Sequence, residues 1–556
     1  MNTSPSEQMP PDRSGVECTE AHANASADEP GDSPAGLHGD TRPDGAPEQH
    51  YRIATPPPLG PDARQRVTLL FQGLTQSHGR LIEGAWEGQG YQVKALPPPD
   101  NAALALGREY CSKGMCNPVY YTVGNLLAYL VRLRQAGVPK IEQRFAYVTA
   151  GACGPCRFGT YEAEFRRALQ QAGFGQFHVV LIQQSDGVSQ SDGWEGLQFD
   201  RNFIMALARA LVVGDLLNEL GHALRPYERD PGSVDEVLAQ GRRWLYWALR
   251  DRESPVPALR RVRRALDELP IDYLRVKPRV KITGEFWAQT TEGDGNYHLA
   301  RWLTEEGAEV MVEPVGTWIE YLLWRQLQWT RDRQGLETDD PRAKRPLREL
   351  WLRMGQILFD SVHNTYRAAL GFRTEALASM ELLARYAQDY YNPRIDGGEA
   401  HMEVAKTIAA VRKRRAHMVV SVKPFGCMPS TQSDGVQVKV LSDYPEALFV
   451  TVETSGDSEV HVKSRIQMVL AEARQRAQAE FAEVAQRLGL ETWLDNPPRE
   501  IDMPTATTPL PHRAIGTAAN YLWWLQRPAA LRALPVPSEA LTDLLRRYRR
   551  GGDGEA

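Results

Sequence analysis

Short apolar segments alternate with amphipathic segments over most of the chain, and this alternation restricts the fold more than any other feature. The apolar runs are four to seven residues long, as buried strands are. Strands separated by helices of about 10–15 residues indicate βαβ units and a parallel sheet. The predicted strands are residues 65–71, 91–95, 145–149, 177–182, 280–283, 309–313, 417–422 and 447–452.

These strands fall into two groups, so we predict an α/β fold with two Rossmann-like lobes, parallel sheets and helical insertions. Between the groups, apolar residues recur at helical spacing over 201–220, 234–250 and 257–269. A second helical stretch covers 316–390, and 462–488 has the pattern of a long closing helix. The predicted organisation is a first lobe at 61–200, a helical insertion at 201–270, a second lobe with an insertion at 271–470, and a C-terminal helix and irregular tail at 471–556.

Residues 1–60 are predicted to be a disordered, acidic, Pro-rich tail. They hold 10 of the 38 prolines, and the first 50 contain ten acids, two arginines and no aromatic residue. Such a segment buries too little apolar surface to offset its ordering entropy.

The overall charge is nearly balanced, with 65 Lys and Arg against 70 Asp and Glu. This balance argues against nucleic-acid and polybasic membrane-surface binding, which both depend on excess basic charge. The sequence also lacks an uninterrupted apolar run of about 20 residues and a secretory signal at its start. We therefore expect a cytoplasmic protein with neither a membrane nor a nucleic acid as partner.

The cysteines are few, but their positions are informative. Cys18 lies in the tail, whereas the others follow predicted strands or precede a predicted helix at 123–136. In open α/β sheets, ligands bind beyond the carboxyl ends of the strands. We therefore predict that distant thiols converge in the cleft between the lobes, the candidates being Cys111, Cys116, Cys153, Cys156 and Cys427.

Converged thiolates in this pattern favour an iron–sulfur cluster over structural zinc. Clusters take Cys thiolates, often beside Pro and Gly, whereas structural zinc usually takes paired Cys-x2-Cys units. This chain has one Cys-x2-Cys pair, at Cys153 and Cys156, one Cys-x4-Cys pair, at Cys111 and Cys116, and the single Cys427.

Two alternatives stay open. Cys153-Gly-Pro-Cys156 after a strand is also typical of a thioredoxin-like dithiol, although Ala152 stands where Trp normally precedes the first thiol. The thiols could instead be buried packing residues, and this reading is strongest for Cys111.

Two other segments are candidates for the site. The loop at 284–296 carries Glu285, Asp294 and Asn296 and could hold a substrate headgroup or be a surface loop. The segment Asp396-Gly-Gly-Glu-Ala400 opens a helix with Asp396 as the natural N-cap, and Glu399 could lie near the site. A nucleotide-binding Gly-x4-Gly-Lys-Ser/Thr motif is absent from the sequence.

Four ordered segments within residues 65–470 resemble the 2-hydroxyacyl-CoA dehydratase family, the group related to CoA-substrate-specific enzyme activases and benzoyl-CoA reductases. Gly-Pro-Cys-Arg-Phe-Gly is the most specific of them. The segments are Gly107-Arg-Glu-Tyr110 with Cys116-Asn-Pro118 and Gly124-Asn125; Gly154-Pro-Cys-Arg-Phe-Gly159 with Tyr161; Gly397-Gly-Glu-Ala400; and Pro424-Phe-Gly-Cys-Met-Pro429.

The resemblance implies a [4Fe-4S]-type cluster between two α/β lobes, with Cys116, Cys156 and Cys427 at the family's thiol positions and hence as metal ligands. Cys153 and Cys111 look like additions to the family's set of thiols, so the number of cubane clusters stays open. Arg157 could stabilise the reduced cluster or steer an anionic thioester, or form a salt bridge at a helix start.

The resemblance also implies the function, which is ATP-driven low-potential electron transfer to a CoA thioester or similar substrate. Because the sequence has no Gly-x4-Gly-Lys-Ser/Thr motif, we expect the activator to be a separate protein, and a homo- or heterodimer stays open. The competing hypotheses are a non-catalytic cluster-bearing assembly factor and a metal-free dithiol protein using Cys153 and Cys156.

The disorder prediction can be tested by truncation. Deleting residues 1–55 should leave the melting temperature almost unchanged, because the tail adds little apolar burial. Differential scanning calorimetry of both chains would measure this, and a large drop would contradict the prediction.

Overall fold

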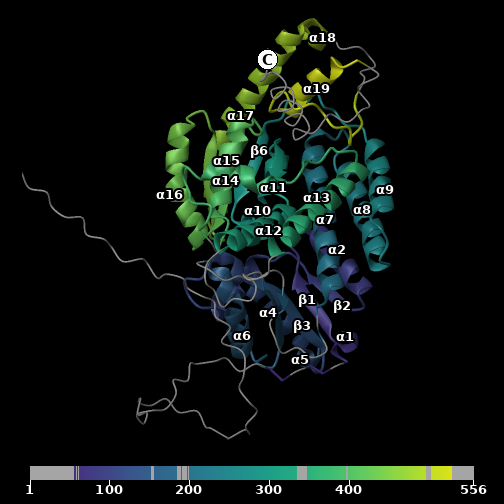
Figure 1. The fold of residues 1–556 in the computed structure, drawn as a ribbon, viewed down its shortest axis with the longest axis vertical. Coiled ribbons are helices and arrows are strands. Elements are labelled where there is room, and N and C mark those ends of the chain that lie inside the picture. Colours follow the sequence, from purple (N-terminus) through teal and green to yellow (C-terminus); the bar gives the residue numbers. More distant parts are fainter. Residues whose placement is uncertain are drawn as a thin grey trace, which may run out of the picture. The chain divides into compact units, whose positions relative to one another are not determined.

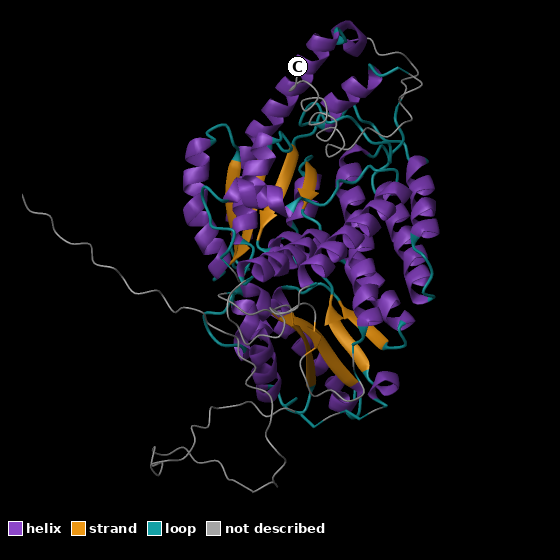
Figure 2. Ribbon diagram, in the orientation of Figure 1, coloured by secondary structure: helices purple, strands orange, loops and turns teal. Residues whose placement is uncertain are grey.

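Two separate β-sheets, each with helices beside it, organise the computed structural model (Figure 2). The structure describes residues 56–57, 59–60, 62–151, 156–183, 189–190, 197, 199–334, 347–395, 398–495 and 503–528. Most of the predicted tail, including Cys18, lies outside the described residues. The α/β class and the two sheets of mainly parallel strands are confirmed.

The first sheet has the strand order β2-β1-β3-β4-β5. All its pairs are parallel except the last, in which the two-residue β5 runs antiparallel to β4. The sequence prediction had no counterpart of β5. The strands are β1 (Thr68–Gln72), β2 (Gln92–Leu96), β3 (Phe145–Gly151), β4 (His178–Gln183) and β5 (Ser189–Gln190).

The second sheet has the order β7-β6-β8-β9 and is parallel throughout. One of its two central strands, β8, is buried along its whole length, which explains why its sequence is mainly apolar. The strands are β6 (Arg279–Gly284), β7 (Glu309–Val312), β8 (Met418–Pro424) and β9 (Phe449–Thr454).

Helices cover both faces of the first sheet. Successive strand residues point to opposite faces, so neighbouring residues of one strand pack against different helices. Leu69 and Phe71 belong to the apolar cluster that includes Trp86 of α2 (Gln76–Gly88) and Phe203 of α7 (Arg201–Leu224). Leu70 belongs to another cluster, with residues of α4 (Asn117–Gln135). This second cluster also contains Val280 and Val420, so one apolar core includes side chains of both sheets.

The remaining helices connect and cover the sheets (Figure 1). The predicted insertions are helical, and 462–488 forms most of one long helix. The helices are α1 (Ala63–Arg66), α3 (Asn101–Tyr110), α5 (Ile141–Arg144), α6 (Tyr161–Gln171), α8 (Ser233–Arg250), α9 (Val256–Asp267), α10 (Phe286–Thr290), α11 (Leu299–Glu305), α12 (Val315–Asp332), α13 (Arg348–Ala369), α14 (Met380–Ala387), α15 (Ala400–Arg412), α16 (Met428–Asp443), α17 (Glu459–Leu488), α18 (Glu491–Asp495) and α19 (Thr517–Leu525).

A buried hydrogen-bond network joins α2, α7 and α12. The carboxylate of Asp215 accepts hydrogen bonds from the backbone N–H groups of Val315 and Gly316, at 2.9 and 2.8 Å. Its Oδ1 also lies 3.1 Å from Nε2 of His78. The carboxylate thereby satisfies two of the free N–H groups at the start of α12.

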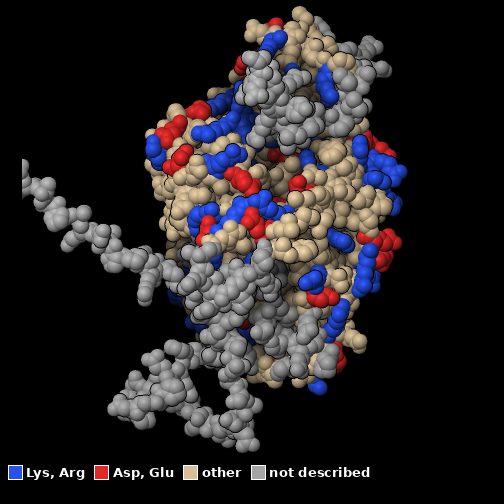
Figure 3. Space-filling model, viewed as in Figure 1, with Lys and Arg blue, Asp and Glu red and all other residues tan. Residues whose placement is uncertain are grey.

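The surface carries both signs of charge. On the face drawn in Figure 3, basic and acidic side chains are interspersed among uncharged residues. Within the described part of the chain, we find no helix with the length and apolar character needed to cross a membrane.

Two glycines of the sequence motifs allow helices α3 and α4 to touch along their backbones. A Cβ on Gly124 would lie well under 3.0 Å from the carbonyl oxygen of Ala103, and one on Gly107 equally close to that of Tyr120. The obstructing atoms are backbone atoms, which cannot move aside as a side chain can. This close packing fixes α4, whose first residue follows Cys116.

Gly124→Ala should therefore destabilise the protein by at least ~2 kcal/mol, in the range of overpacked cores. Gly435→Ala in α16 is the matched control, since a Cβ there meets nothing within 4 Å and removing a helical glycine is neutral or stabilising. Urea unfolding of both variants measures the difference, and equal stability would contradict the packing argument.

Candidate functional site

Three of the predicted cysteines lie where chain segments leave the sheets. Cys156 follows β3 and Cys427 follows β8, whereas Cys116 directly precedes α4. The strand order of the first sheet reverses between β1 and β3, and that of the second between β6 and β8. Crevices at such switch points are the usual ligand sites of open α/β sheets.

Each of these three cysteines is the N-cap of a helix. Cys116 caps α4, Cys156 caps the short 3-10 helix Arg157–Thr160, and Cys427 caps α16. The first backbone N–H groups of a helix lack partners within it and carry a partial positive charge. Helix starts of this kind favour negative charge, such as that of a thiolate.

Backbone contacts bring the Cys116 and Cys427 segments together. Asn117 donates its backbone N–H to the carbonyl of Phe425 at 3.2 Å and its side-chain amide to the carbonyl of Thr454 at 2.6 Å. Gly426 has φ +78°, and a Cβ there would stand 3.5 Å from Cα of Cys116 and 3.6 Å from Nη1 of Arg157. The positive φ explains why glycine precedes Cys427.

The three thiols share charged and polar neighbours. Burial is the main cause of the raised pKa of the three thiols, and the charge of ionised Glu285, which follows β6, adds to it at Cys116, Cys156 and Cys427. The sulfur of Cys116 lies 3.1 Å from the hydroxyl of Tyr161, in a hydrogen bond. The structure therefore brings Cys116, Cys156 and Cys427 into one neighbourhood.

The other two candidate cysteines are not placed in this group. Cys153 lies outside the described residues. Cys111 is 2% exposed, ends α3, and has Glu164, Arg167 and Lys113 as its charged neighbours.

Burial dominates the electrostatics of the thiols. It raises the pKa of Cys116 to about 11 and that of Cys156 to about 12, and it raises the pKa of Cys427 strongly. Hydrogen bonding to Tyr161 and the charge of Arg157 lower the pKa of Cys116, but by less than burial raises it. Without a bound metal, the three sites hold protonated thiols at neutral pH.

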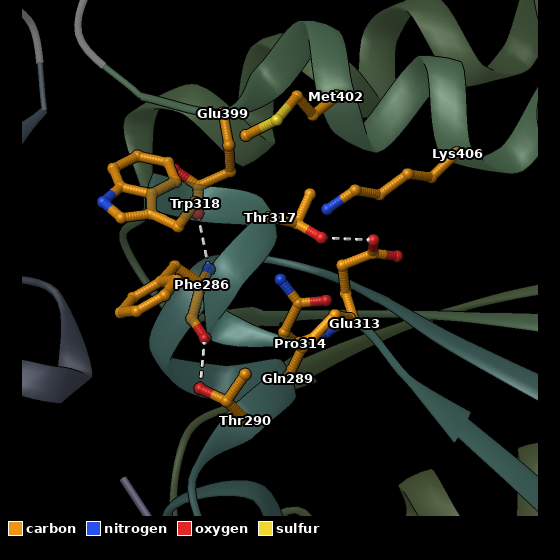
Figure 4. A pocket seen from close by; sticks show the side chains of 10 residues that line it. All are labelled: Phe286, Gln289, Thr290, Glu313, Pro314, Thr317, Trp318, Glu399, Met402 and Lys406. Carbon is orange, nitrogen blue, oxygen red and sulfur yellow. Dashed lines mark hydrogen bonds between the residues drawn. The ribbon is translucent and has the colours of Figure 1, made fainter. Parts of the chain in front are cut away.

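Three glutamates act on the thiols or on one another, Glu399 and Glu403 being buried and Glu285 partly buried. Burial raises the pKa of Glu285, Glu399 and Glu403, and each lies near enough to another for its charge to add to the effect. Oε1 of Glu399 accepts the backbone N–H of Phe286, at the start of α10 (Figure 4). These carboxyl groups can hold protons near neutral pH inside a site that excludes water.

A hydrogen-bond chain connects Cys427 to one of these carboxyl groups. The Cys427 thiol donates to Oγ of Ser430 at 3.3 Å, and Ser430 donates to Oε1 of Glu403 at 2.7 Å. Ser433 donates to the other oxygen of Glu403. The chain offers a proton path between a thiol and a carboxyl group.

Arg157, the predicted neighbour of a ligand, connects two of the thiol-bearing segments. It donates from Nη1 to the carbonyl of Gly114, close to Cys116, and it lies beside Gly426. Its positive charge favours the thiolate of Cys116.

One local prediction was wrong, since the N-cap of α15 is Glu399, whereas Asp396 lies outside the described residues. The chain turns at Gly398, whose φ is +124° and where an added Cβ would collide with Pro429. Of the two readings of 284–296, the surface loop is excluded, since the segment contains α10 with buried Trp287 and Gln289.

The sequence analysis missed Glu403, Ser430 and Lys406. A usable signal was present for Glu403 and Lys406, because Glu399, Glu403 and Lys406 recur at spacings of four and three in an otherwise mainly apolar helix. That pattern places charges on one face of a buried element, where charges are rare unless they have a function.

The three thiols are not arranged as the ligands of a single metal ion. Within the part of the chain that the structure describes, no three His, Cys, Asp or Glu side chains are grouped closely enough to hold one. The thiols belong to three separate loops, with Cys116 and Cys427 buried and Cys156 partly exposed.

No family model matches the sequence, and a search of curated proteins gives no match. The family resemblance therefore depends on the motif residues alone.

The raised pKa values predict slow alkylation of the metal-free protein. At pH 8 only about one in a thousand thiols with a pKa near 11 is ionised, so iodoacetamide should modify Cys116, Cys156 and Cys427 at least ~100-fold more slowly than glutathione. Mass spectrometry of timed samples measures the rates, and unfolding in urea should abolish the protection. Rapid modification of Cys156 in the native protein would instead favour the dithiol hypothesis.

Proposed function

We propose that this chain is an iron–sulfur protein of the 2-hydroxyacyl-CoA dehydratase type. In this proposal Cys116, Cys156 and Cys427 hold a [4Fe-4S]-type cluster between the two sheets, in a cytoplasmic protein that works with a separate ATP-hydrolysing activator. One observation carries the proposal, namely that three free thiols from three loops share the neighbour Glu285.

When bound, such a cluster supplies low-potential one-electron transfer to a CoA thioester or a similar substrate. The chain's own residues provide the surroundings for it. The N-termini of α4, α16 and the 3-10 helix at Arg157 offset negative charge at the three sulfurs. Tyr161 can donate its hydroxyl hydrogen to the Cys116 sulfur, and such hydrogen bonds tune the potential.

Three thiols leave a fourth coordination position for a substrate or a small ligand. Glu285 and Glu399 stand beside the thiols and can hold protons, because their burial favours the neutral form. In their protonated form they add no repulsion to an anionic cluster. The raised thiol pKa values imply that loading releases protons and strengthens as the pH rises.

The same pKa values weigh against the metal-free dithiol alternative. Thiol exchange requires an accessible thiolate, usually with a lowered pKa. Cys156 has a raised pKa and is only partly exposed.

Cysteine substitutions test the ligand assignment. In anaerobically reconstituted protein, Cys116→Ser, Cys156→Ser and Cys427→Ser should each lose most of the bound iron and sulfide, because each removes one of three anchoring sulfurs. Cys111→Ser is the control, since the charged neighbours of Cys111 differ from those of the other three. Iron and sulfide analysis with visible absorption measures loading, and wild-type iron in Cys156→Ser would refute the assignment.

A further inference from the structure

Helix α13 (Figure 1) carries an apolar stripe that is exposed in the described part of the structure. Of the fifteen large apolar side chains that are exposed among the described residues, six lie on α13 or at its N-cap. Their exposed fractions run from 50% to 71%, and Trp351 has the largest. The six are Leu347, Leu350, Trp351, Met354, Ile357 and Leu358.

These side chains share one face of the helix. They occupy positions a, d and e of a heptad that begins at Leu347, and such positions form a continuous stripe along a helix. Single exposed apolar residues are common on protein surfaces, whereas a contiguous apolar patch marks an interaction site. Trp and Met are also enriched in protein–protein interfaces.

The core of the chain accounts for the other half of α13. The buried residues of this helix begin at His363, and Tyr366 belongs to the apolar cluster that contains residues of α7 and α9. In the first half, Arg331 of α12 donates to Glu349 at 2.9 Å, and every residue of the helix before His363 is at least partly exposed. The stripe therefore lies on the half of α13 that packs least into the protein.

The charges beside the stripe favour a protein over a membrane as the partner. Between Arg348 and Val362 the helix has two basic and two acidic side chains, which give no net charge. Amphipathic helices that lie on membranes instead have an excess of Lys and Arg on the polar face.

The same charges match a second copy of this helix. Arg353 and Asp360 are both exposed, and both occupy position g of the heptad, at the edge of the stripe. When two identical helices pack antiparallel about a two-fold axis, their g positions lie on the same side of the pair. Arg353 can then face Asp360 of the second copy, and this pair occurs twice. In a parallel pair, g faces e, and position e holds the uncharged Leu358 and Thr365.

We propose that α13 is a dimer interface, in which its stripe packs antiparallel against the stripe of a second copy and Arg353 pairs with Asp360 of that copy. Burial of the apolar side chains would supply the affinity, and the two ion pairs would set the orientation. A two-fold axis makes both copies use the same surface, which is the commonest symmetry of oligomers. This inference goes beyond the proposed function, because the interface requires neither the thiols nor iron.

Sedimentation velocity of the full chain over a dilution series tests the interface. Wild-type protein should sediment as a dimer that dissociates on dilution. Trp351→Glu should weaken dimerisation at least ~10-fold, because it places a charge inside the apolar stripe. Trp247→Glu is the matched control, since Trp247 is 52% exposed on α8 and its substitution should leave dimerisation unchanged.

An exchange of charges tests the antiparallel arrangement. Arg353→Asp and Asp360→Arg should each weaken dimerisation about 10-fold, because each places like charges opposite one another. The double variant should regain the dimerisation of the wild type, since it restores the pair with its signs exchanged. Within one chain the exchange restores no contact, because the two positions are two helical turns apart.

Four results would overturn the proposal. They are a monomer at every concentration, wild-type dimerisation by Trp351→Glu, a double variant that dimerises no better than the single ones, and binding of anionic lipid vesicles by the wild type but not by Trp351→Glu. Circular dichroism of each variant establishes that it is folded.

Discussion

The site depends on how the loop before α4 is held against the carboxyl ends of β8 and β9. Asn117 makes this connection with two hydrogen bonds to backbone carbonyls, and Asn117 is 1% exposed, so water competes little for those carbonyls. Gly426 allows the approach because it has no side chain and adopts a positive φ. Without this contact, Cys116 and Cys427 would belong to two unrelated surfaces.

Much of the fold could be predicted because the strands are short, apolar and rich in β-branched residues. The prediction of 417–422 corresponds to β8 at Met418–Pro424, and that of 145–149 to β3 at Phe145–Gly151. The two-residue β5 could not be predicted, since it is defined by its pairing with β4 and not by its own composition. The buried helix α10 was missed because its Gly-rich flanks resemble a loop.

Part of the site could also be predicted from the positions of the strands. A cysteine after a strand must lie near the carboxyl edge of its sheet, so the positions of Cys156 and Cys427 followed from the strand prediction. The contact between the two sheets follows from tertiary packing, and so do the hydrogen-bond partners of Glu403. Local sequence does not show which buried charges come together after folding.

The positions of the thiols along the chain have one more consequence. Cys116 and Cys427 are 311 positions apart (427 − 116), and the hydrogen bonds of Asn117 hold their segments together. Bringing such distant positions together costs loop-closure entropy, which native packing offsets. A group held by all three sulfurs would therefore crosslink distant parts of the chain.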